Sequence, residues 1–387
     1  MIVAVPKETF PGEHRVALVL ASLPPLVKSG THVHIEAGAG VAAGFTDEAY
    51  RAAGAEIIAD RRQLFQSADL VLQVRGLGAN PHAGAADLEF MREGLVILAP
   101  CDPLGNPAAV KQLAERGITL FAMELIPRIT RAQSMDVLSS MASIAGYEAV
   151  LMAALALPKL FPMMMTAAGT IAAARVLVLG AGVAGLQAIA TAKRLGALVS
   201  AYDVRAAVKE QIESLGAKFV VLDMGESAEG TGGYAKAMDE AFYKKQRELL
   251  GNVLRDQNVV ISTAAVPGKK APVLITREMA EKMMPGSVIV DIAAERGGNC
   301  ELTRAGETVR HNGVTIIGPT NMASMAPQDA SQMYATNLIN FLKPMVTKEG
   351  AISINREDEI IRDTMVTWEG KIVHPKILEL MGPEAKA

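Results

Sequence analysis

Short apolar runs alternate with helical patterns along the first third of the chain. Continuous apolar runs suit strands that are buried on both faces of a sheet, whereas apolar residues about three to four positions apart suit helices that cover it. Strand followed by helix, repeated several times, indicates a mostly parallel sheet. The predicted strands are Ile2–Val5, Val33–Glu36, Leu70–Val74, Leu95–Leu98 and Ile118–Phe121, and helices are predicted near Ala21–Ser29, Asp47–Ala53 and Asn106–Arg116.

The same alternation starts again after Pro162 and predicts a second sheet. Past Pro319, we expect a helix over Ala330–Leu342 and a hairpin over Thr364–His374 with its turn at Glu369-Gly370. The strands predicted for the second sheet are Arg175–Gly180, Leu198–Tyr202, Phe219–Leu222, Val259–Ser262, Val288–Ile292 and Val314–Ile317.

Together the two series predict an α/β protein with two doubly wound Rossmann-like domains joined by long helices. Residues 1–138 and 325–387 are expected to form an N-terminal α/β domain that the C-terminal segment completes, and residues 139–324 to form the second domain. The chain has 387 residues. That length suffices for two cores at about 100–200 residues each.

The most apolar segment, Val137–Pro158, raises the question of a membrane span. Glu148 interrupts it, and neither uninterrupted piece reaches the about 20 residues that a spanning helix needs. We therefore interpret it as a buried helix, with Ser134 as its N-cap. The run of methionines at 163–165 is interpreted as core packing beneath the second domain.

Composition and charge exclude several classes of function. The net charge is −3 at pH 7 and no basic cluster stands out, so a nucleic-acid partner has little support. Cys101 and Cys300 lie far apart, and His32 and His34 have no third ligand nearby, so neither a disulfide nor a metal site is expected. The N-terminus shows no export signal, and a cytoplasmic location is expected.

A glycine motif, G-x-G-x-x-G, occupies residues 180–185, directly after a predicted strand and at the start of a predicted helix. Gly180 permits the tight turn, Gly182 lets a pyrophosphate approach the backbone, and Gly185 allows the helix to pack closely on the strand. In this context the motif predicts dinucleotide binding, with a bare βα turn as the weaker alternative.

An acidic residue, Asp203, stands at the end of the second strand of that domain. A carboxylate there accepts hydrogen bonds from the adenosine ribose and repels a 2′-phosphate, which favours NAD. Arg205 leaves the alternative open, because an arginine near the strand end can take a 2′-phosphate. It could equally stack on adenine or lie in solvent.

Two further segments carry polar residues that could serve a site. Arg128, Gln133, Asp136 and Ser139 form a polar run at the domain junction, and the last three fall at i, i+3 and i+6 of one predicted helical face; a solvated helix start is the alternative. The segment Met224–Leu250 is glycine-rich and suggests a mobile lid near 224–236, in which Tyr234 could cover the nicotinamide. A plain surface loop explains it equally well.

Four stretches, considered together, resemble the NAD(H)-binding component (domain I, alpha subunit) of proton-translocating NAD(P) transhydrogenase, within the superfamily that includes alanine dehydrogenase. The resemblance covers essentially the whole chain. The stretches are RITRAQSMD at 128–136, FPMMMTAAGT at 161–170, GVAGLQAIATAKRLG at 182–196 and DIAAERGGNC at 291–300.

The resemblance implies roles for particular residues. Arg128, Gln133, Asp136 and Ser139 would hold the nicotinamide end, and Tyr234 would close over bound NAD(H). The contacts that it implies with the cofactor involve Arg128, Ile129, Thr130, Arg131, Gln133, Gly180, Gly182, Val183, Gly185, Asp203, Val204, Arg205, Gly233 and Ala265.

The function implied is direct hydride transfer between NADH and NADP⁺ bound on a partner subunit, coupled to proton translocation by membrane subunits. A homodimer, peripheral on the inner membrane through those partners, is implied as well. The alternatives are an alanine dehydrogenase-like oxidoreductase and a non-catalytic NAD-sensing module. Against the first, the positions that match the alanine dehydrogenase substrate-site lysine and histidine are Arg75 and Asp102 here.

Overall fold

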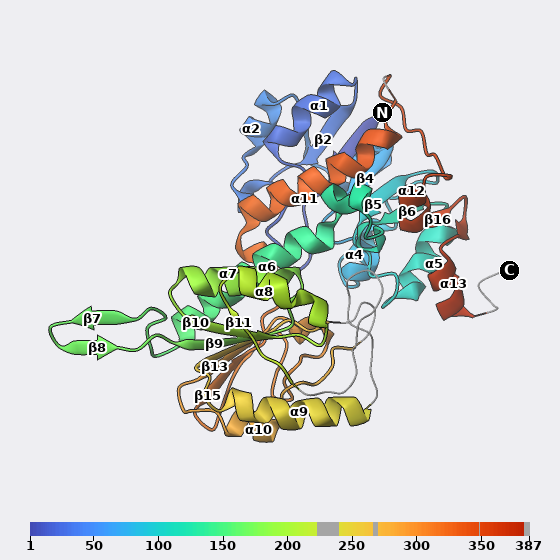
Figure 1. The fold of residues 1–387 in the computed structure, drawn as a ribbon. Coiled ribbons are helices and arrows are strands. Elements are labelled where there is room, and N and C mark those ends of the chain that lie inside the picture. Colours follow the sequence, from blue (N-terminus) through green and yellow to red (C-terminus); the bar gives the residue numbers. More distant parts are fainter. Residues whose placement is uncertain (223–239, 266–269, 348, 383–387) are drawn as a thin grey trace. The chain divides into compact units, whose positions relative to one another are not determined.

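The computed structural model describes residues 1–222, 240–265, 270–347 and 349–382, and the chain divides into two compact units (Figure 1). Unit 1 comprises Met1–Met141 and Ser324–Ala387, and unit 2 comprises Ala142–Ala323. The helix α6 (Val137–Ala156) crosses the boundary between them. Each unit contains its own sheet and its own buried cores. The α/β class and the doubly wound architecture predicted from the sequence are confirmed.

The sheet of unit 1 has eight strands in the order β3-β2-β1-β4-β5-β6-β16-β17. The first six are parallel, and β16 and β17 add an antiparallel edge that comes from the C-terminal segment. The order reverses between β1 and β4, as in doubly wound folds. The strands are β1 (Ile2–Val5), β2 (His32–Glu36), β3 (Glu56–Ile58), β4 (Leu70–Leu72), β5 (Val96–Ala99), β6 (Thr119–Ala122), β16 (Met365–Trp368) and β17 (Lys371–Ile372).

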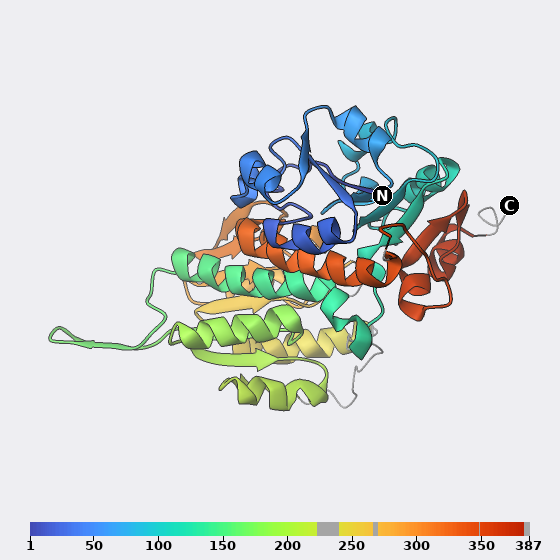
Figure 2. The same ribbon diagram turned by 90° about the horizontal axis from the view of Figure 1, so that it is seen from above.

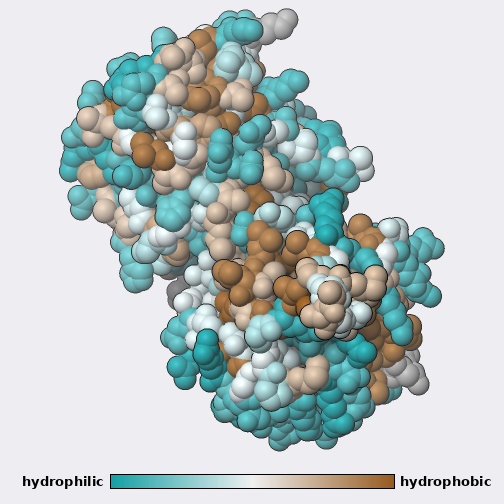
Figure 3. All heavy atoms as spheres, turned by 90° about the vertical axis from the view of Figure 1, so that its left-hand side faces the viewer, coloured by the Kyte–Doolittle hydropathy of each residue, from teal (hydrophilic) through white to brown (hydrophobic). Residues whose placement is uncertain are grey.

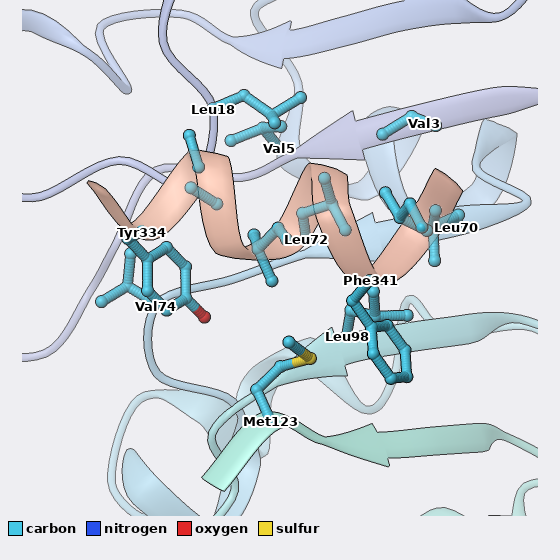
Figure 4. Close-up of a cluster of buried hydrophobic side chains, with 14 of the residues drawn as sticks. Val3, Val5, Leu18, Leu70, Leu72, Val74, Leu98, Met123, Tyr334 and Phe341 are labelled. Atoms are coloured by element: carbon cyan, nitrogen blue, oxygen red, sulfur yellow. The ribbon is translucent and has the colours of Figure 1, made fainter. Parts of the chain in front are cut away.

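Helices cover both faces of this sheet. Side chains alternate along each strand, so that Val3 and Val5 join one core and Ala4 joins the other. On the first face lies α11, whose Tyr334 and Phe341 are packed against strand residues (Figure 4). The helices of unit 1 are α1 (Leu23–Lys28), α2 (Asp47–Ala52), α3 (Arg61–Ser67), α4 (Gly84–Asp87), α5 (Pro107–Glu115), α11 (Pro327–Leu342), α12 (Glu359–Thr364) and α13 (Pro375–Met381).

Unit 2 repeats the doubly wound order in a seven-stranded sheet, β11-β10-β9-β12-β13-β15-β14. Only β14, at one edge, is antiparallel to its neighbour. The order reverses between β9 and β12. The strands are β9 (Arg175–Leu179), β10 (Leu198–Tyr202), β11 (Lys218–Phe219), β12 (Val259–Ser262), β13 (Val288–Asp291), β14 (Thr308–His311) and β15 (Val314–Ile317).

In unit 2, α6, α7 and α8 cover one face of the sheet and α9 and α10 cover the other (Figures 1 and 2). By length and composition α6 could cross a membrane, and about a third of its most apolar window is buried. Ala149, Val150 and Ala153 of α6 are fully buried in the core of unit 2, as in a helix that packs on protein. The other helices are α7 (Val183–Arg194), α8 (Lys209–Ser214), α9 (Glu240–Leu254) and α10 (Arg277–Glu281).

A separate hairpin, β7 (Met164–Thr166) with β8 (Gly169–Ile171), precedes the sheet of unit 2 and contradicts one prediction. The methionines at 163–165 are not core residues: Met163 is 60% exposed, Met164 42% and Met165 75%. The chain turns back at Gly169, whose φ is +121°, so these residues form a free-standing ribbon instead of a buried strand.

The point at which the strand order of unit 1 reverses is filled by a side chain of the unit itself. Glu8, just after β1, accepts hydrogen bonds from the N–H groups of Val74 (2.6 Å) and Arg75 (3.2 Å), just after β4. Doubly wound sheets usually bind a ligand in this crevice. In unit 1 no glycine turn follows β1, and the carboxyl group of Glu8, whose pKa burial raises to about 8, accepts from the backbone donors there.

A second carboxyl group, that of Glu124, lies at the same edge of the sheet after β6. One of its oxygens accepts from the N–H groups of Cys101 (2.8 Å) and Asp102 (2.6 Å), while Oε2 is buried and has no partner among the described residues. Burial raises the pKa of Glu124 from 4.5 to about 7, although the two N–H donors act in the opposite direction. A carboxyl with this environment favours its neutral form.

The raised pKa of Glu124 predicts a pH-dependent stability of unit 1. The folded protein holds this proton up to about pH 7 and the unfolded chain releases it near 4.5, so stability falls as pH rises through that range. We expect Glu124→Gln to be more stable than the natural protein at pH 8 by on the order of 3 kcal/mol, and close to it at pH 5. Denaturant titration followed by Trp368 fluorescence reports on unit 1. An equal difference at both pH values would contradict the assignment.

Candidate functional site

The glycine motif forms the turn between β9 and α7 in unit 2. Gly180 has a φ of +94°, which favours glycine, and a Cβ there would lie 2.6 Å from the hydroxyl of Thr263. A Cβ on Gly185 would overlap the carbonyl oxygen of Gly180. The motif therefore brings the start of α7 directly against the end of β9.

Gly182, the N-cap of α7, is different, because a Cβ there would meet nothing within 4 Å. Its φ is −76°, so its backbone conformation does not demand glycine, and the residue is exposed. With no side chain to cap the helix, the first N–H groups of α7 remain available to an anion. What glycine provides at 182 is open space over a helix N-terminus.

The side chain of Asp203, just after β10, is 5% exposed and accepts a hydrogen bond from the glycine turn. Its Oδ2 accepts from the N–H of Ala181 at 2.7 Å, which ties the glycine turn after β9 to the end of β10. The sequence predicts that this carboxylate accepts hydrogen bonds from the adenosine ribose.

Arg205 forms a two-point ion pair with Asp203. Its Nε donates to Oδ1 at 2.9 Å and its Nη2 to Oδ2 at 2.8 Å, and its backbone N–H donates to Oδ1 at 2.9 Å. Such pairs are stronger than single hydrogen bonds. In this geometry Asp203 holds the guanidinium that could otherwise take a 2′-phosphate, which favours NAD over NADP.

The edge also contains a residue that sequence analysis missed, Thr263, just after β12. Its hydroxyl donates to the carbonyl of Gly180 (3.1 Å) and lies 3.3 Å from that of Leu179. The strand order reverses between β9 and β12, so this contact spans the crevice in which ligands of such sheets bind. No local signal marks Thr263, because it is 83 positions from Gly180.

A second set of predicted site residues lies in unit 1. Asp136 accepts from the hydroxyl of Ser139 (2.6 Å) and from its N–H (2.9 Å), and Arg128 Nε lies 4.0 Å from Oδ2 of Asp136. Three of the four residues of the polar run are thus brought together. Gln133 is exposed nearby in sequence, within the 3₁₀ helix Thr130–Met135.

Two details predicted for this run are wrong. Asp136 has an extended ψ of 94° between the 3₁₀ helix and α6, so Gln133, Asp136 and Ser139 do not share the face of one helix. The cap of α6 is Asp136 rather than Ser134, because the Asp136 carboxylate accepts from the N–H of Ser139. The carbonyl of Ser134 instead accepts from the side chain of Asn337 at 2.9 Å.

The remaining predicted contacts have varied surroundings. Arg131 forms a two-point ion pair with Asp358, both bonds 2.7 Å, so its guanidinium ties the 3₁₀ helix to α12. Val204 packs against the core of unit 2, and Ala265 is exposed at the end of a described segment. Gly233, Tyr234 and the predicted lid near 224–236 lie outside the described residues.

Arg75 and Asp102, the two positions that the resemblance matches to alanine dehydrogenase substrate residues, both make contacts within unit 1. Arg75 donates to Glu13 at 3.3 Å and lies 4.1 Å from the centre of the Phe10 ring. The same Glu13 carboxylate takes two hydrogen bonds from the side chain of Arg15. Asp102 adopts a left-handed φ of 46°, and its carbonyl accepts from Gly105 and Asn106. No histidine stands at these two positions.

Comparison with known proteins gives the same family for both units. Residues 4–145 match the N-terminal domain of the alanine dehydrogenase/PNT family, and residues 149–375 match its C-terminal domain. The chain belongs to this family. The predicted membership is therefore confirmed.

Within the alanine dehydrogenase/PNT family, similarity is greater to transhydrogenase components. The chain is 50% identical over 380 residues to the first part of the NAD(P) transhydrogenase alpha subunit of Rhodospirillum rubrum, covering 97% of this chain and 99% of the relative. A crystal structure of transhydrogenase from Sinorhizobium meliloti matches with a TM-score of 0.86 at 46% identity, over 96% of this chain and 100% of that one. The alanine dehydrogenase of Bacillus subtilis is 28% identical over 99% of this chain and 96% of its own length.

The ion pair at the end of β10 generates a test of nucleotide choice. Replacing Asp203 by serine should weaken NADH binding about 10- to 100-fold, since a charge-assisted contact is lost, and should strengthen NADPH binding by releasing Arg205. Fluorescence titration with both nucleotides measures each Kd. The matched control is the double variant Asp203→Ser/Arg205→Ala, in which the gain for NADPH should vanish. A gain that survives in the double variant would show that Arg205 does not take the phosphate.

Proposed function

We propose that this chain is the NAD(H)-binding component of a proton-translocating transhydrogenase. The observation that carries the proposal is the open glycine turn at the strand-order reversal of unit 2, backed by Asp203, in a chain 50% identical over nearly its whole length to the first part of a transhydrogenase alpha subunit. The diphosphate lies on the N-terminus of α7, and Asp203 receives the adenosine ribose hydroxyls.

The reaction proposed is hydride transfer to NADP⁺ that is bound on a partner subunit. Bound NADH supplies the hydride. Arg128, Gln133, Asp136 and Ser139 hold its nicotinamide end, with Ser139 and Arg128 oriented by the Asp136 carboxylate. The resemblance also assigns Tyr234, Gly233 and the segment near 224–236 to closure over the nucleotide, and these residues lie outside the part of the chain that the structure describes. Transfer between two nicotinamides needs no proton donor, only two C4 atoms in near-attack geometry.

The location and coupling follow from the same proposal. NADP(H) binds on a partner, and membrane subunits move the proton, so this chain is peripheral on the cytoplasmic side of the membrane. The alpha subunit of Cereibacter sphaeroides, which is 45% identical, is longer, and this chain covers 71% of it.

A homodimer is proposed for the chain, and the exposed hairpin of unit 2 supports it. An isolated two-stranded hairpin is marginally stable in water unless it packs on something. Apolar side chains gather around this hairpin, which points toward the viewer in Figure 3. A hollow of about 700 Å³, lined by residues 157–162 and 194–196 and by Ala154, lies at the end of α6 in the same unit. A second copy of the chain would cover these surfaces.

The dimer proposal predicts that charges on the hairpin will separate the copies. Met163→Asp/Met165→Asp should convert the dimer to a monomer at micromolar concentration, because both side chains are exposed in one chain and would be buried against another. Sedimentation equilibrium measures the mass. Val41→Asp in unit 1, a residue 59% exposed, is the matched control and should leave the dimer unchanged. A monomeric natural chain, or a dimer unaffected by the hairpin variant, would contradict the proposal.

The alternatives differ in what the isolated chain can do. An alanine dehydrogenase needs an acid/base group for proton transfer as well as a hydride acceptor. With Arg75 paired to Glu13 and Asp102 in place of a histidine, we expect no reduction of NAD⁺ by alanine. A sensing module would bind NADH and never turn it over.

One assay separates the three functions. The chain is mixed with NADH, a spectrally distinct NADP⁺ analogue and candidate NADP-binding and membrane subunits, and hydride transfer is followed by absorbance. Transfer only in the presence of partners is expected. Alanine-dependent NAD⁺ reduction by the chain alone would overturn the proposal, and binding without transfer in any mixture would favour the sensing module.

Within that assay, Gln133 provides a sharper prediction. Gln133→Asn shortens an exposed side chain and leaves the contacts among Arg128, Asp136 and Ser139 in place. It should slow hydride transfer at least about 10-fold while changing the Kd for NADH less than about 3-fold, since misplacement affects the transition state more than binding. Equal losses in rate and affinity would indicate a binding role only.

A further inference from the structure

The stretch at 291–300 forms a buried cluster of polar groups around Asp291 in unit 2, called the Asp291 cluster below. The proposed hydride transfer makes no use of it. It begins at Asp291, the last residue of β13, and passes through the short 3₁₀ helix Ala294–Arg296. Gly297 and Gly298 then have φ of +95° and +78°, two successive left-handed residues. The reversal places Asn299 beside Asp291, and both side chains are fully buried.

Asp291 is surrounded by donors. Its two oxygens accept from the hydroxyls of Ser262 (3.0 Å) and Thr303 (2.7 Å) and from the N–H groups of Ala293 (3.1 Å), Asn299 (2.7 Å) and Cys300 (3.0 Å). A buried carboxylate is costly unless its hydrogen bonds are made, and here they are. The Asp291 side chain therefore fixes the backbone of the Asp291 cluster.

The amide of Asn299 reaches the loop after β12. Its Oδ1 accepts from the N–H of Ala264 at 3.1 Å, and its Nδ2 donates to the carbonyls of Ala264 and Pro272, each at 2.8 Å. Both backbone groups of Ala264 are thus paired with one side chain, as they would be with a neighbouring strand. Asn299 makes the hydrogen bonds that a neighbouring strand would make, at a point where the sheet has ended.

Ala264 lies next to the residue that clamps the glycine turn. Thr263 donates to the carbonyl of Gly180, and a Cβ on Gly180 would lie 3.3 Å from the N of Ala264. Ala265, one residue on, is exposed at the same edge. The Asp291 cluster is therefore linked through Asn299, Ala264 and Thr263 to the turn on which the diphosphate would lie.

We propose that Asn299, oriented by Asp291, is a positioning residue for the dinucleotide: it holds the loop after β12 against the glycine turn in the geometry that receives NAD(H). The inference rests on the proposed function and deepens it. Asn299 touches no nucleotide atom and acts through Ala264 and Thr263.

The test compares two asparagines at opposite ends of the same sheet. Asn299→Ala removes the three contacts with Ala264 and Pro272. Asn258→Ala removes one contact with the N–H of Arg175, at the amino end of β9, and is the matched control. Both proteins are titrated with NADH, as the whole chain, at a temperature where thermal unfolding shows each to be fully folded.

We expect the Kd for NADH to rise at least about 10-fold in Asn299→Ala and to stay within about 2-fold in Asn258→Ala. Hydrogen exchange should accelerate at the N–H groups of Ala264 and Gly180 in the first variant only. A milder variant, Thr303→Val, removes one donor to Asp291 and should raise the Kd by about 3-fold, which covers the case in which Asn299→Ala fails to fold.

The outcomes separate the inference from the function on which it rests. If the natural chain binds NADH and Asn299→Ala and Thr303→Val bind it with unchanged affinity, the Asp291 cluster has a structural role only. The inference is then wrong, while the proposed function stands. If both asparagine variants lose affinity equally, the effect is a general loss of stability and the inference is again wrong. If the natural chain does not bind NADH, the proposed function fails as well.

Discussion

In unit 2 the strand order reverses between β9 and β12, and the candidate site is built around this reversal. Connections leave these two strands in opposite directions, so their carboxyl ends border a crevice that no crossover covers. The glycine turn enters the crevice from β9, and Thr263 enters it from β12 and fixes the turn by its hydroxyl. Asp203 closes the third side by binding the N–H of Ala181. The candidate site forms because the glycine turn, Thr263 and Asp203 all lie at the carboxyl edge of this sheet.

Unit 1 has the same reversal of strand order but no open crevice there, which shows that topology alone does not make a site. There Glu8 occupies the reversal point and satisfies the N–H groups of Val74 and Arg75. No glycine turn opens the start of a helix to an anion, and the neighbouring edge carries the neutral-leaning carboxyl of Glu124. The two sheets thus illustrate a crevice left open by glycine and one filled by a glutamate side chain.

Much of this arrangement could be predicted from the sequence, because strands buried on both faces leave continuous apolar runs. Ile2–Val5 and Val259–Ser262 were predicted with the bounds that the structure has. The short edge strands β3 and β14 were missed, since a half-exposed strand of three or four residues carries little pattern. The methionines at 163–165 were misassigned because apolar character alone does not distinguish a core residue from an exposed one. The Asp291 cluster could not be predicted, since Asn299 and Ala264 are 35 positions apart in the sequence.

If the dinucleotide binds over the open space at Gly182, as we propose, a side chain at this position should displace it. A side chain at 182 meets no atom of the protein and requires no unusual φ, so Gly182→Val should fold normally. It would, however, fill the space above the start of α7. Calorimetric titration should show one NADH bound per natural chain, and an affinity at least about 100-fold lower in Gly182→Val at an unchanged melting temperature. Undiminished binding by the variant would show that the dinucleotide does not lie over Gly182.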